Sequence, residues 1–418
     1  MLSRRQLIRS AGGGAVALGT ATLAAGLPAP RLAIGADGQP RLDPTLPEGT
    51  RQEAVLEALQ GKAPLIKLSY RPPNYETPVG YFDQLYTPND AFFVRYHLAG
   101  IPETIDPAAW RLTVGGEAAG KPFALTLDQL KRDFEPVEIV AVCQCSGNRR
   151  GLFQPHVPGV QWGYGAMGNA RWKGARLKHI LERAGVTREA LEVVLDGADG
   201  PVLDTTPDFV KSIPIWKALD ENTLVAYEMN GQPLPHFNGF PARIVVPGWT
   251  ATYWVKHVTS IRAISKPFDG FWIKSAYRIP TGRFPLVQRF ASQETETSTP
   301  ISEMVVNSLI TNLAEGQKLR VGEPVEVRGV AWDGGYGIRT VQVSSDGGET
   351  WGDATLGEDA GRFSFRPWSF RFVPPKAGRY TVMASASNRI GQTQTAELIL
   401  NPAGYHHNVM PRVTLTVA

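Results

Sequence analysis

Cys143 and Cys145 are the only cysteines in a chain of 418 residues, and they follow an apolar, β-branched stretch. A thiolate at the end of a strand is well placed to bind a metal. The side chains of a C-x-C pair point to the same face of a strand. A disulfide between such close neighbours is strained, and a tetrahedral zinc site needs two further ligands. The plainer alternative is that both cysteines are buried and act as small hydrophobic residues.

The segment that begins at Cys145 favours metal chemistry over simple packing. Residues 145–150 read Cys-Ser-Gly-Asn-Arg-Arg, and we call them the cysteine loop. The apolar residues at 137–142 predict a strand, and Ser-Gly-Asn predicts a turn after it. Arg149 and Arg150 then add two guanidinium groups, which bind oxyanions in bidentate fashion. The block therefore predicts a softly ligated metal beside an oxyanion site.

Other candidates lie at the ends of predicted strands. Arg95 and His97 follow the apolar residues 92–94 and alternate onto one face. Asp199 follows the strand predicted over 191–195. Taken singly, these residues are typical of a solvated arginine, a satisfied histidine and a turn aspartate.

Two further segments are recognisable by their turn chemistry. Residues 161–177 are glycine-rich and lead into a helix predicted over 177–184, but they lack the phosphate-loop and dinucleotide-binding spacings. Residues 226–235 contain an Asn-Gly pair that predicts a β-hairpin.

Together these segments resemble the sulfite oxidase family, in the same order along the chain. The likeness rests on the cysteine loop, on Phe-Phe-Val-Arg-x-His at 92–97, and on the segments 226–235, 238–243 and 253–257. In that family the loop cysteine ligates the molybdenum of a molybdopterin cofactor. The resemblance assigns this role to Cys145. It implies an α+β fold, with a sulfite-oxidase-type molybdopterin-binding domain followed by an immunoglobulin-like β-sandwich.

The resemblance also implies roles for individual residues. The substrate-binding and catalytic residues would be Arg95, Arg150, Tyr277, Trp162 and Arg412. The cofactor-binding residues would be Tyr96, His97, Cys145, Asp199, Asn238, Arg243, Trp254, Val255 and Lys256. Arg243 would bind the pterin phosphate bidentately, and Asn238 stands where animal members carry histidine.

The implied activity is oxidation of sulfite to sulfate at molybdenum, with electrons passed to a c-type cytochrome. The chain has no C-x-x-C-H haem attachment motif, so the carrier is expected to be a separate protein. Two alternatives stay open, a molybdopterin-dependent S-oxide or N-oxide reductase and a non-catalytic exported binding module. Within the family, oxidation of a sulfur carried on another protein is a third.

The first residues predict export. Arg4 and Arg5 precede a weakly apolar run too glycine-rich for a membrane span, which is typical of a twin-arginine signal peptide over residues 1–36 and of a periplasmic protein. This leader carries four arginines and no acidic residue, and so accounts for the formal net charge of +4. Nucleic-acid binding therefore loses its main support.

The remaining chain divides into three predicted parts. Residues 37–80 are read as a proline-rich arm with a helical stretch at 52–59, residues 81–295 as the catalytic domain, and residues 296–418 as the sandwich. Strands of the sandwich are predicted at 303–311, 324–332, 338–344, 363–372, 378–388 and 392–400. Many family members dimerise through this domain, so a homodimer is expected.

Overall fold

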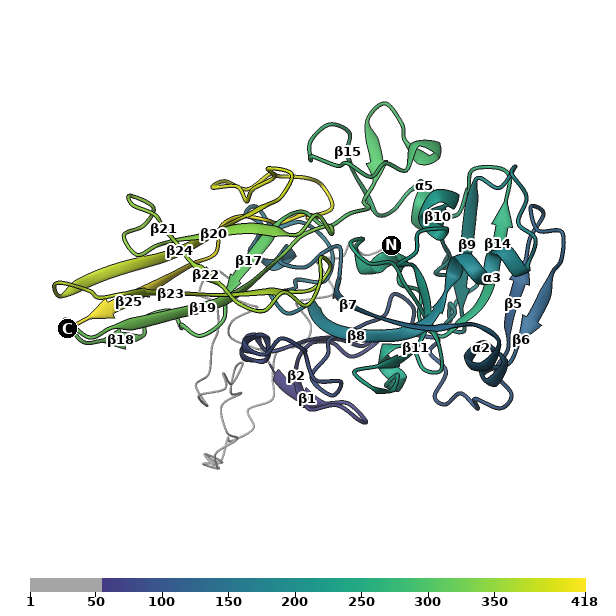
Figure 1. The fold of residues 1–418 in the computed structure, drawn as a ribbon, viewed down its shortest axis with the longest axis horizontal. Helices are drawn as coiled ribbons and strands as arrows, with labels where there is room; N and C mark the ends of the chain where they lie inside the picture. The colour runs from purple at the N-terminus through teal and green to yellow at the C-terminus, as the bar shows by residue number, and fades with distance from the viewer. Residues whose placement is uncertain (1–54) are drawn as a thin grey trace, which may run out of the picture.

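The computed structural model describes residues 55–418, which form an elongated molecule with a mixed domain at one end and a β-sandwich at the other (Figure 1). The predicted leader and the first part of the predicted arm lie outside the described residues. Most of the regular structure is strand, and the α-helices are short. They are α2 (Leu127–Asp133), α3 (Leu177–Arg183), α4 (Ile215–Ala218) and α5 (Phe271–Lys274).

The described part of the predicted arm belongs to a four-stranded sheet, in the order β1-β2-β3-β4. Its strands are β1 (Val55–Ala58), β2 (Pro64–Ser69), β3 (Asn74–Glu76) and β4 (Val94–Arg95). The helix predicted over 52–59 is wrong where the structure describes it, because Val55 to Ala58 pair antiparallel with β2. Tertiary pairing here overrides a local preference for helix. Through β3 the sheet reaches β4, which carries Arg95.

A second sheet has the order β12-β11-β8-β7, with β13 paired to β11. Its strands are β7 (Pro136–Gln144), β8 (Met167–Arg176), β11 (Leu224–Met229), β12 (Gln232–Pro233) and β13 (Arg243–Val245). Cys143 lies in its edge strand β7, and Cys145 follows directly after the end of that strand. The predicted hairpin is confirmed between β11 and β12. Asn230 and Gly231 have φ of 52° and 76°, as a two-residue hairpin turn requires.

A third sheet closes the far end of the mixed domain, in the order β10-β9-β14-β5-β6. Its strands are β5 (Leu112–Gly115), β6 (Phe123–Leu125), β9 (Glu192–Gly197), β10 (Lys211–Pro214) and β14 (Val258–Ile264). A capping box at Thr126 and Gln129 begins α2 beside it. A two-stranded ribbon of β15 (Arg278–Pro280) and β16 (Ser298–Pro300) leads to the sandwich.

Two facing sheets form the sandwich. One contains β17 (Asn307–Ile310), β19 (Val325–Trp332), β22 (Thr355–Leu356) and β23 (Arg366–Phe372). The other contains β18 (Lys318–Leu319), β20 (Ile338–Ser344), β21 (Gly352–Asp353), β24 (Gly378–Asn388) and β25 (Arg412–Val417). Val327, Trp368, Val341 and Leu415 meet in the core between them. The strand predicted over 392–400 is wrong, since only isolated bridges form there and β25 pairs with β24 instead.

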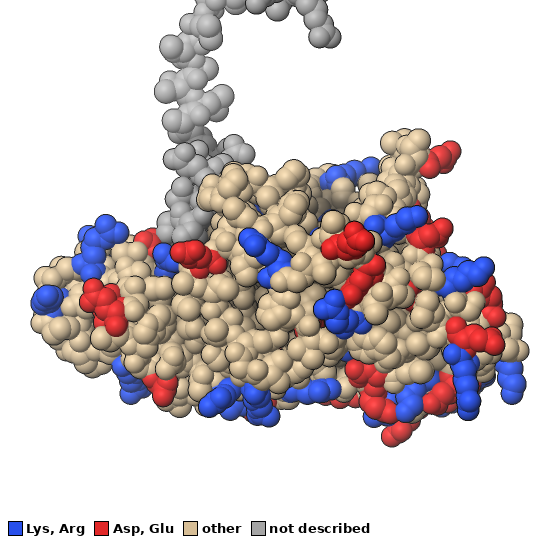
Figure 2. Space-filling model, turned by 90° about the horizontal axis from the view of Figure 1, so that it is seen from above, with Lys and Arg blue, Asp and Glu red and all other residues tan. Residues whose placement is uncertain are grey.

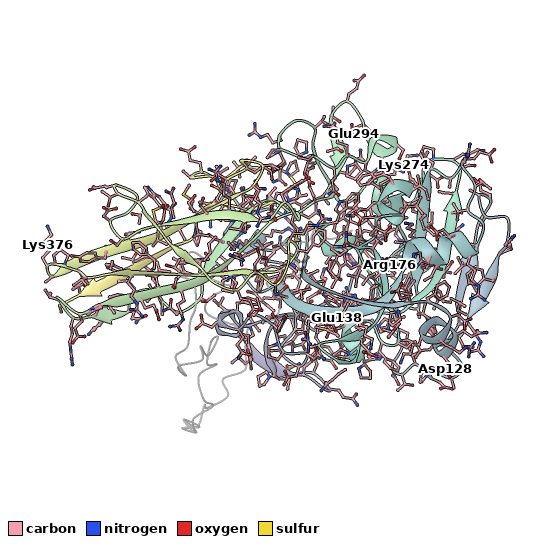
Figure 3. The ribbon with its side chains drawn as sticks, in the orientation of Figure 1. Asp128, Glu138, Arg176, Lys274, Glu294 and Lys376 are labelled. Carbon is pink, nitrogen blue, oxygen red and sulfur yellow. The ribbon has the colours of Figure 1, made fainter. Side chains whose placement is uncertain are left out.

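Side chains fill both domains along their whole length (Figure 3). The labelled Lys376 marks the free end of the sandwich and Asp128, in α2, the opposite end of the molecule. On the face shown in Figure 2, basic and acidic side chains are interspersed rather than gathered by sign. Within residues 55–418, no helix is both long and apolar enough to cross a membrane.

Candidate active site

A cavity lies in the mixed domain and brings together residues in, or next to, strands of all three of its sheets. Every residue predicted to bind the cofactor lines it, and so do Arg95 and Tyr277. Arg150, Trp162 and Arg412 are not in its wall. The structure thus gathers most of the predicted site around one space.

The cysteines reach this cavity from the end of β7. Both are buried free thiols, and both line the cavity, as expected for side chains two residues apart on a strand. The backbone N–H of Cys145 donates to the Ala166 carbonyl at 2.9 Å, and the Asn148 N–H donates to the Cys145 carbonyl at 3.0 Å. Asn148 Oδ1 accepts the Ala166 N–H at 3.1 Å. The cysteine loop is therefore held against residues 163–166.

A buried carboxylate holds that neighbouring segment in turn. Glu76, at the end of β3, accepts the N–H groups of Gly163 at 2.7 Å and Gly165 at 2.8 Å. Burial raises the pKa of Glu76 to about 7, and these backbone donors oppose the increase. Trp162 is fully buried next to this segment, and its carbonyl accepts the Gly151 N–H at 2.9 Å. In this structure Trp162 thus packs behind the cysteine loop.

Arg95, His97 and Tyr277 form one end of the cavity. The His97 Nε2 atom shares a hydrogen bond with the Tyr277 hydroxyl, and the His97 ring stacks on Phe209 at 3.7 Å between centroids. Arg95 Nη1 donates to Asn74 Oδ1 at 3.1 Å and to the Tyr96 carbonyl. Burial lowers the pKa of His97 well below its usual range, and the neighbouring cations lower it further.

Tyr277 is held in an unusual backbone conformation. Its φ is 59°, in the left-handed region that non-glycine residues seldom occupy and that costs on the order of 1–3 kcal/mol. Burial also raises the pKa of its phenol. At neutral pH this end of the cavity therefore has a neutral imidazole, a neutral hydroxyl and the guanidinium of Arg95.

The two arginines of the cysteine loop have different positions from those expected. Arg149, with φ of 67°, is fully buried and donates to Asn307 Oδ1 at 2.6 Å and to the Ser308 carbonyl at 2.8 Å. Its guanidinium thus extends into the sandwich domain. Arg150 donates to the carbonyls of Ala403 at 2.9 Å and Val160 at 3.2 Å. The sequence predicted that both arginines bind an oxyanion, and for Arg149 this prediction is wrong because its guanidinium is used in the sandwich domain.

Arg412 was expected to reach the substrate site from the sandwich domain, but Tyr405 approaches it instead. Arg412 is exposed at the start of β25, where it pairs with Met383 in the sandwich. Tyr405 is buried, and its ring is nearly parallel to that of Tyr277, with centroids 5.6 Å apart. The structure therefore does not bring Arg412 to the cavity.

Buried charges dominate the opposite end of the cavity. Arg243 lies between Trp172 and Trp254, and its Nη atoms donate to the carbonyls of Asn238 at 2.9 Å and Trp254 at 3.1 Å. Lys256 Nζ lies over the Tyr96 ring and donates to the Phe237 carbonyl at 3.2 Å. Burial lowers the pKa of Lys256 well below its usual range, although Asp199 opposes this decrease.

Asp199 and Asn238 complete this end. Burial raises the pKa of Asp199 to about 6, while Lys256 opposes the increase. The Asn238 amide is oriented from both sides, because its Nδ2 donates to the Phe93 carbonyl at 3.1 Å and its Oδ1 accepts from Lys62. Lys62, which lies outside the predicted site, thus places a buried amine behind Asn238, and burial lowers the pKa of this amine to about 7.

Two further residues lie at or near the cavity but belong to no motif in the sequence, so they were not predicted. Phe209 packs on His97 and lines the cavity. Lys211 is fully buried, with Nζ 4.8 Å from the ring centroids of both Tyr253 and Tyr277. These contacts join segments far apart in the sequence, so no local pattern could indicate them.

The wall of the cavity fits a bound molybdopterin group. Arg243 Nε and Thr252 Oγ1 are buried there without a hydrogen-bond partner among residues 55–418. Buried polar atoms normally have partners, so these two mark contacts for a ligand. Cys145 is a soft ligand for the metal, Arg243 is a cation for a phosphate, and the Lys256 amine is a hydrogen-bond donor beside it.

A metal at Cys145 also requires ligands from the cofactor itself. In the described part of the chain, no group of three or more histidine, cysteine, aspartate or glutamate side chains could hold a metal ion. A dithiolene-bearing cofactor would supply such ligands from its own sulfurs, and Cys145 would hold the metal from the protein side. The fold and this cavity thus define a molybdopterin-binding oxidoreductase with a second, immunoglobulin-like domain.

Comparison with known proteins identifies the family. Residues 97–272 match the oxidoreductase molybdopterin binding domain, and residues 298–418 match the Mo-co oxidoreductase dimerisation domain. Chicken sulfite oxidase is 34% identical over 326 residues, which cover 74% of this chain and 68% of that enzyme. Human mitochondrial sulfite oxidase is 36% identical over 329 residues, covering 76% of this chain and 58% of that enzyme. The chain belongs to the sulfite oxidase family.

The chain spans less than two thirds of the length of the human and macaque mitochondrial enzymes, 58% and 66% respectively. Among solved structures, the sulfane dehydrogenase SoxCD from Paracoccus pantotrophus superposes with a TM-score of 0.71 and 23% identity. That match covers 87% of this chain and 90% of the other, and it supports the fold alone.

Proposed function

We propose that the protein oxidises sulfite to sulfate at a molybdenum centre held by Cys145. The observation that carries the proposal is that Cys145 shares one cavity wall with Arg95, His97 and Tyr277. A soft metal ligand beside a cationic and hydroxyl-bearing end suits a small sulfur oxyanion. The relatives named sulfite oxidase support this substrate.

The residues of the chain would have distinct roles in this reaction. When bound, the molybdenum cofactor supplies the two-electron oxidation. Arg95 attracts the sulfite anion and orients it by charge-assisted hydrogen bonds. Tyr277, with His97 as its partner, contributes a neutral hydroxyl that hydrogen-bonds one sulfite oxygen. Arg243, Lys256 and Asp199 hold the cofactor at the other end of the cavity.

Electrons would leave to a c-type cytochrome, in the periplasm, from a homodimeric enzyme. The absence of a C-x-x-C-H motif favours an acceptor on another protein. Arg4 and Arg5 support twin-arginine export, which carries folded proteins with their cofactor already inserted. The match to a dimerisation domain supports the dimer.

Metal analysis of the purified mature protein, combined with sulfite-dependent reduction of cytochrome c, tests this proposal. We expect sulfite turnover and about one molybdenum per chain, bound in the cavity that contains Cys145. The protein could instead contain molybdenum, fail to oxidise sulfite, and reduce an S-oxide or N-oxide with electrons from a reduced dye. That result would show that the enzyme is a reductase. A folded protein without molybdenum would contradict the assignment of Cys145 as a metal ligand. It would favour the alternative of a non-catalytic binding module.

A further inference from the structure

A loop of the sandwich domain packs behind residues at the substrate end of the cavity, although the loop itself does not line the cavity. The loop, residues 401–405, precedes β25, and its path brings Tyr405 next to Tyr277. The planes of the two rings differ by 12°, with 5.6 Å between centroids, which is an offset-stacked geometry. Since Tyr277 carries the hydroxyl that shares a hydrogen bond with His97, Tyr405 supports a residue that faces the cavity.

The same loop holds Arg150 at two points. The guanidinium carbon of Arg150 lies 5.2 Å from the centroid of the Tyr405 ring, within cation–π range. Arg150 Nε donates to the Ala403 carbonyl at 2.9 Å. Two of the five guanidinium donors are used by carbonyls, those of Ala403 and Val160. Arg150 does not line the cavity, but its charge lies close enough to oppose protonation of His97 and to favour ionisation of Tyr277, and the Tyr405 ring sets its position.

Internal hydrogen bonds make the loop rigid. Asn401 Oδ1 accepts the Tyr405 N–H at 3.0 Å, and Asn401 Nδ2 donates to the Tyr405 carbonyl at 2.9 Å. Gly404 has φ of 61°, and a Cβ atom there would lie 2.9 Å from Arg150 Cγ. Glycine is therefore required both by the backbone conformation and by the close approach of Arg150.

We propose that Tyr405 is a positioning residue through which the sandwich domain sets the Arg150 guanidinium and the Tyr277 ring for anion binding. It acts through these two residues and does not itself line the cavity. This role rests on the proposed function, in which the anion that binds at this end of the cavity is sulfite. Its test uses sulfate, which probes the same oxyanion chemistry without turnover.

Sulfate binding to the purified holoprotein by titration calorimetry is the primary measurement. Tyr405→Leu removes the ring, and we expect its Kd for sulfate to rise about tenfold, in line with loss of one partly desolvated cation–π contact. Tyr405→Phe keeps the ring and should bind sulfate within about twofold of wild type. Tyr380→Leu is the matched control, because Tyr380 packs against the sandwich core and does not line the cavity.

A double-mutant cycle separates positioning from general stability. In an Arg150→Gln background, Tyr405→Leu should lower sulfate affinity by less than it does in the wild type, because one of the two groups that Tyr405 positions is already absent. Full additivity would overturn the proposed route through Arg150. In steady state, Tyr405→Leu should raise KM for sulfite more than it lowers kcat, with molybdenum content unchanged.

Each remaining outcome also decides the proposal. Wild-type affinity for sulfate in folded Tyr405→Leu, or no sulfate binding by the wild type, would overturn it. If Tyr405→Leu loses its thermal unfolding transition, Tyr405→Met replaces it, because its long, flexible side chain can fill an irregular gap but lacks a ring face. Wild-type protein that binds sulfate but does not oxidise sulfite would contradict the proposed function while leaving the role of Tyr405 testable by binding.

Discussion

Arg149 Nη1 donates a hydrogen bond to Asn307 Oδ1 at 2.6 Å and so ties the cysteine loop to the first strand of the sandwich domain. Further contacts follow the same boundary. Trp332 Nε1 donates to Gln144 Oε1 at 2.7 Å, and the Val142 N–H donates to the Phe363 carbonyl at 2.9 Å. The free edge of β7 is therefore covered by the sandwich, and the second domain is a structural support for Cys145.

Replacing Arg149 with lysine should destabilise this boundary. Lysine cannot reproduce two fixed guanidinium bonds, to Asn307 and Ser308, inside a buried site. We expect the free energy of unfolding to fall by about 2 kcal/mol, the value of a hydrogen bond to a charged group. Thermal unfolding would measure it. Arg371→Lys, at an exposed guanidinium of the sandwich, is the control, and equal effects of the two changes would contradict the account.

Cys145→Ser should abolish turnover while the protein still folds. A serine hydroxyl is a hard, protonated group and a poor substitute for a thiolate on molybdenum. We expect sulfite-dependent cytochrome c reduction to fall by at least about 100-fold, with thermal unfolding close to wild type. Normal turnover in this variant would remove the basis of the proposed function.

Cys143→Ser is the matched comparison for that variant. Cys143 also lines the cavity, but its sulfur accepts from Arg243 Nη2 at 3.8 Å, and a serine hydroxyl can accept there as well. We therefore expect molybdenum to be retained, with a smaller loss of activity than in Cys145→Ser. Loss of molybdenum from Cys143→Ser alone would instead make Cys143 the ligand. Metal analysis of both variants distinguishes these cases.

Arg95→Gln and Arg412→Gln should differ sharply in their kinetics. Arg95 lines the cavity, so its loss should lower kcat/KM for sulfite on the order of 100-fold, as for one lost oxyanion donor. Arg412 is exposed on β25, so its substitution should change kcat/KM by less than about twofold. Steady-state assays with sulfite provide the comparison. A large loss of kcat/KM in Arg412→Gln would contradict this account. It would mean that Arg412 acts at the substrate site of a second copy of the chain.

Glu76 should make stability depend on pH in a defined direction. Burial raises its folded-state pKa to about 7, above the usual value of 4.5. The folded protein therefore holds a proton that the unfolded chain releases, and stability falls as pH rises from about 4.5 to 7. Glu76→Gln cannot titrate, so the stability of wild type minus that of the variant should fall over this interval and level off above about pH 8.

Chemical unfolding of both proteins across this pH range measures the difference. Subtraction removes the contributions of other buried groups, such as His257 and His407, whose pKa values burial lowers to about 3. A difference that does not change with pH would show that Glu76 is ionised in the folded protein throughout.

Local sequence determined the parts of the site that depend on neighbouring residues. Strand alternation placed Cys143 and Cys145 on one face, and Asn230 with Gly231 specified a hairpin turn, because both follow from backbone geometry within a few residues. The family motifs further indicated the residues expected to bind the cofactor, and one cavity gathers these residues. Most strands of the sandwich were also recognisable from their alternation.

Tertiary structure decided which side chains of these segments reach the cavity. Arg149 and Arg150 are adjacent, yet one enters the sandwich domain and the other lies against Tyr405. Residues 55–58 form a strand because β2 lies beside them. The expectation for Arg412 failed because the loop 401–405, and not β25, approaches the site. These outcomes depend on how the domains pack, and packing joins residues too far apart for a local pattern to record.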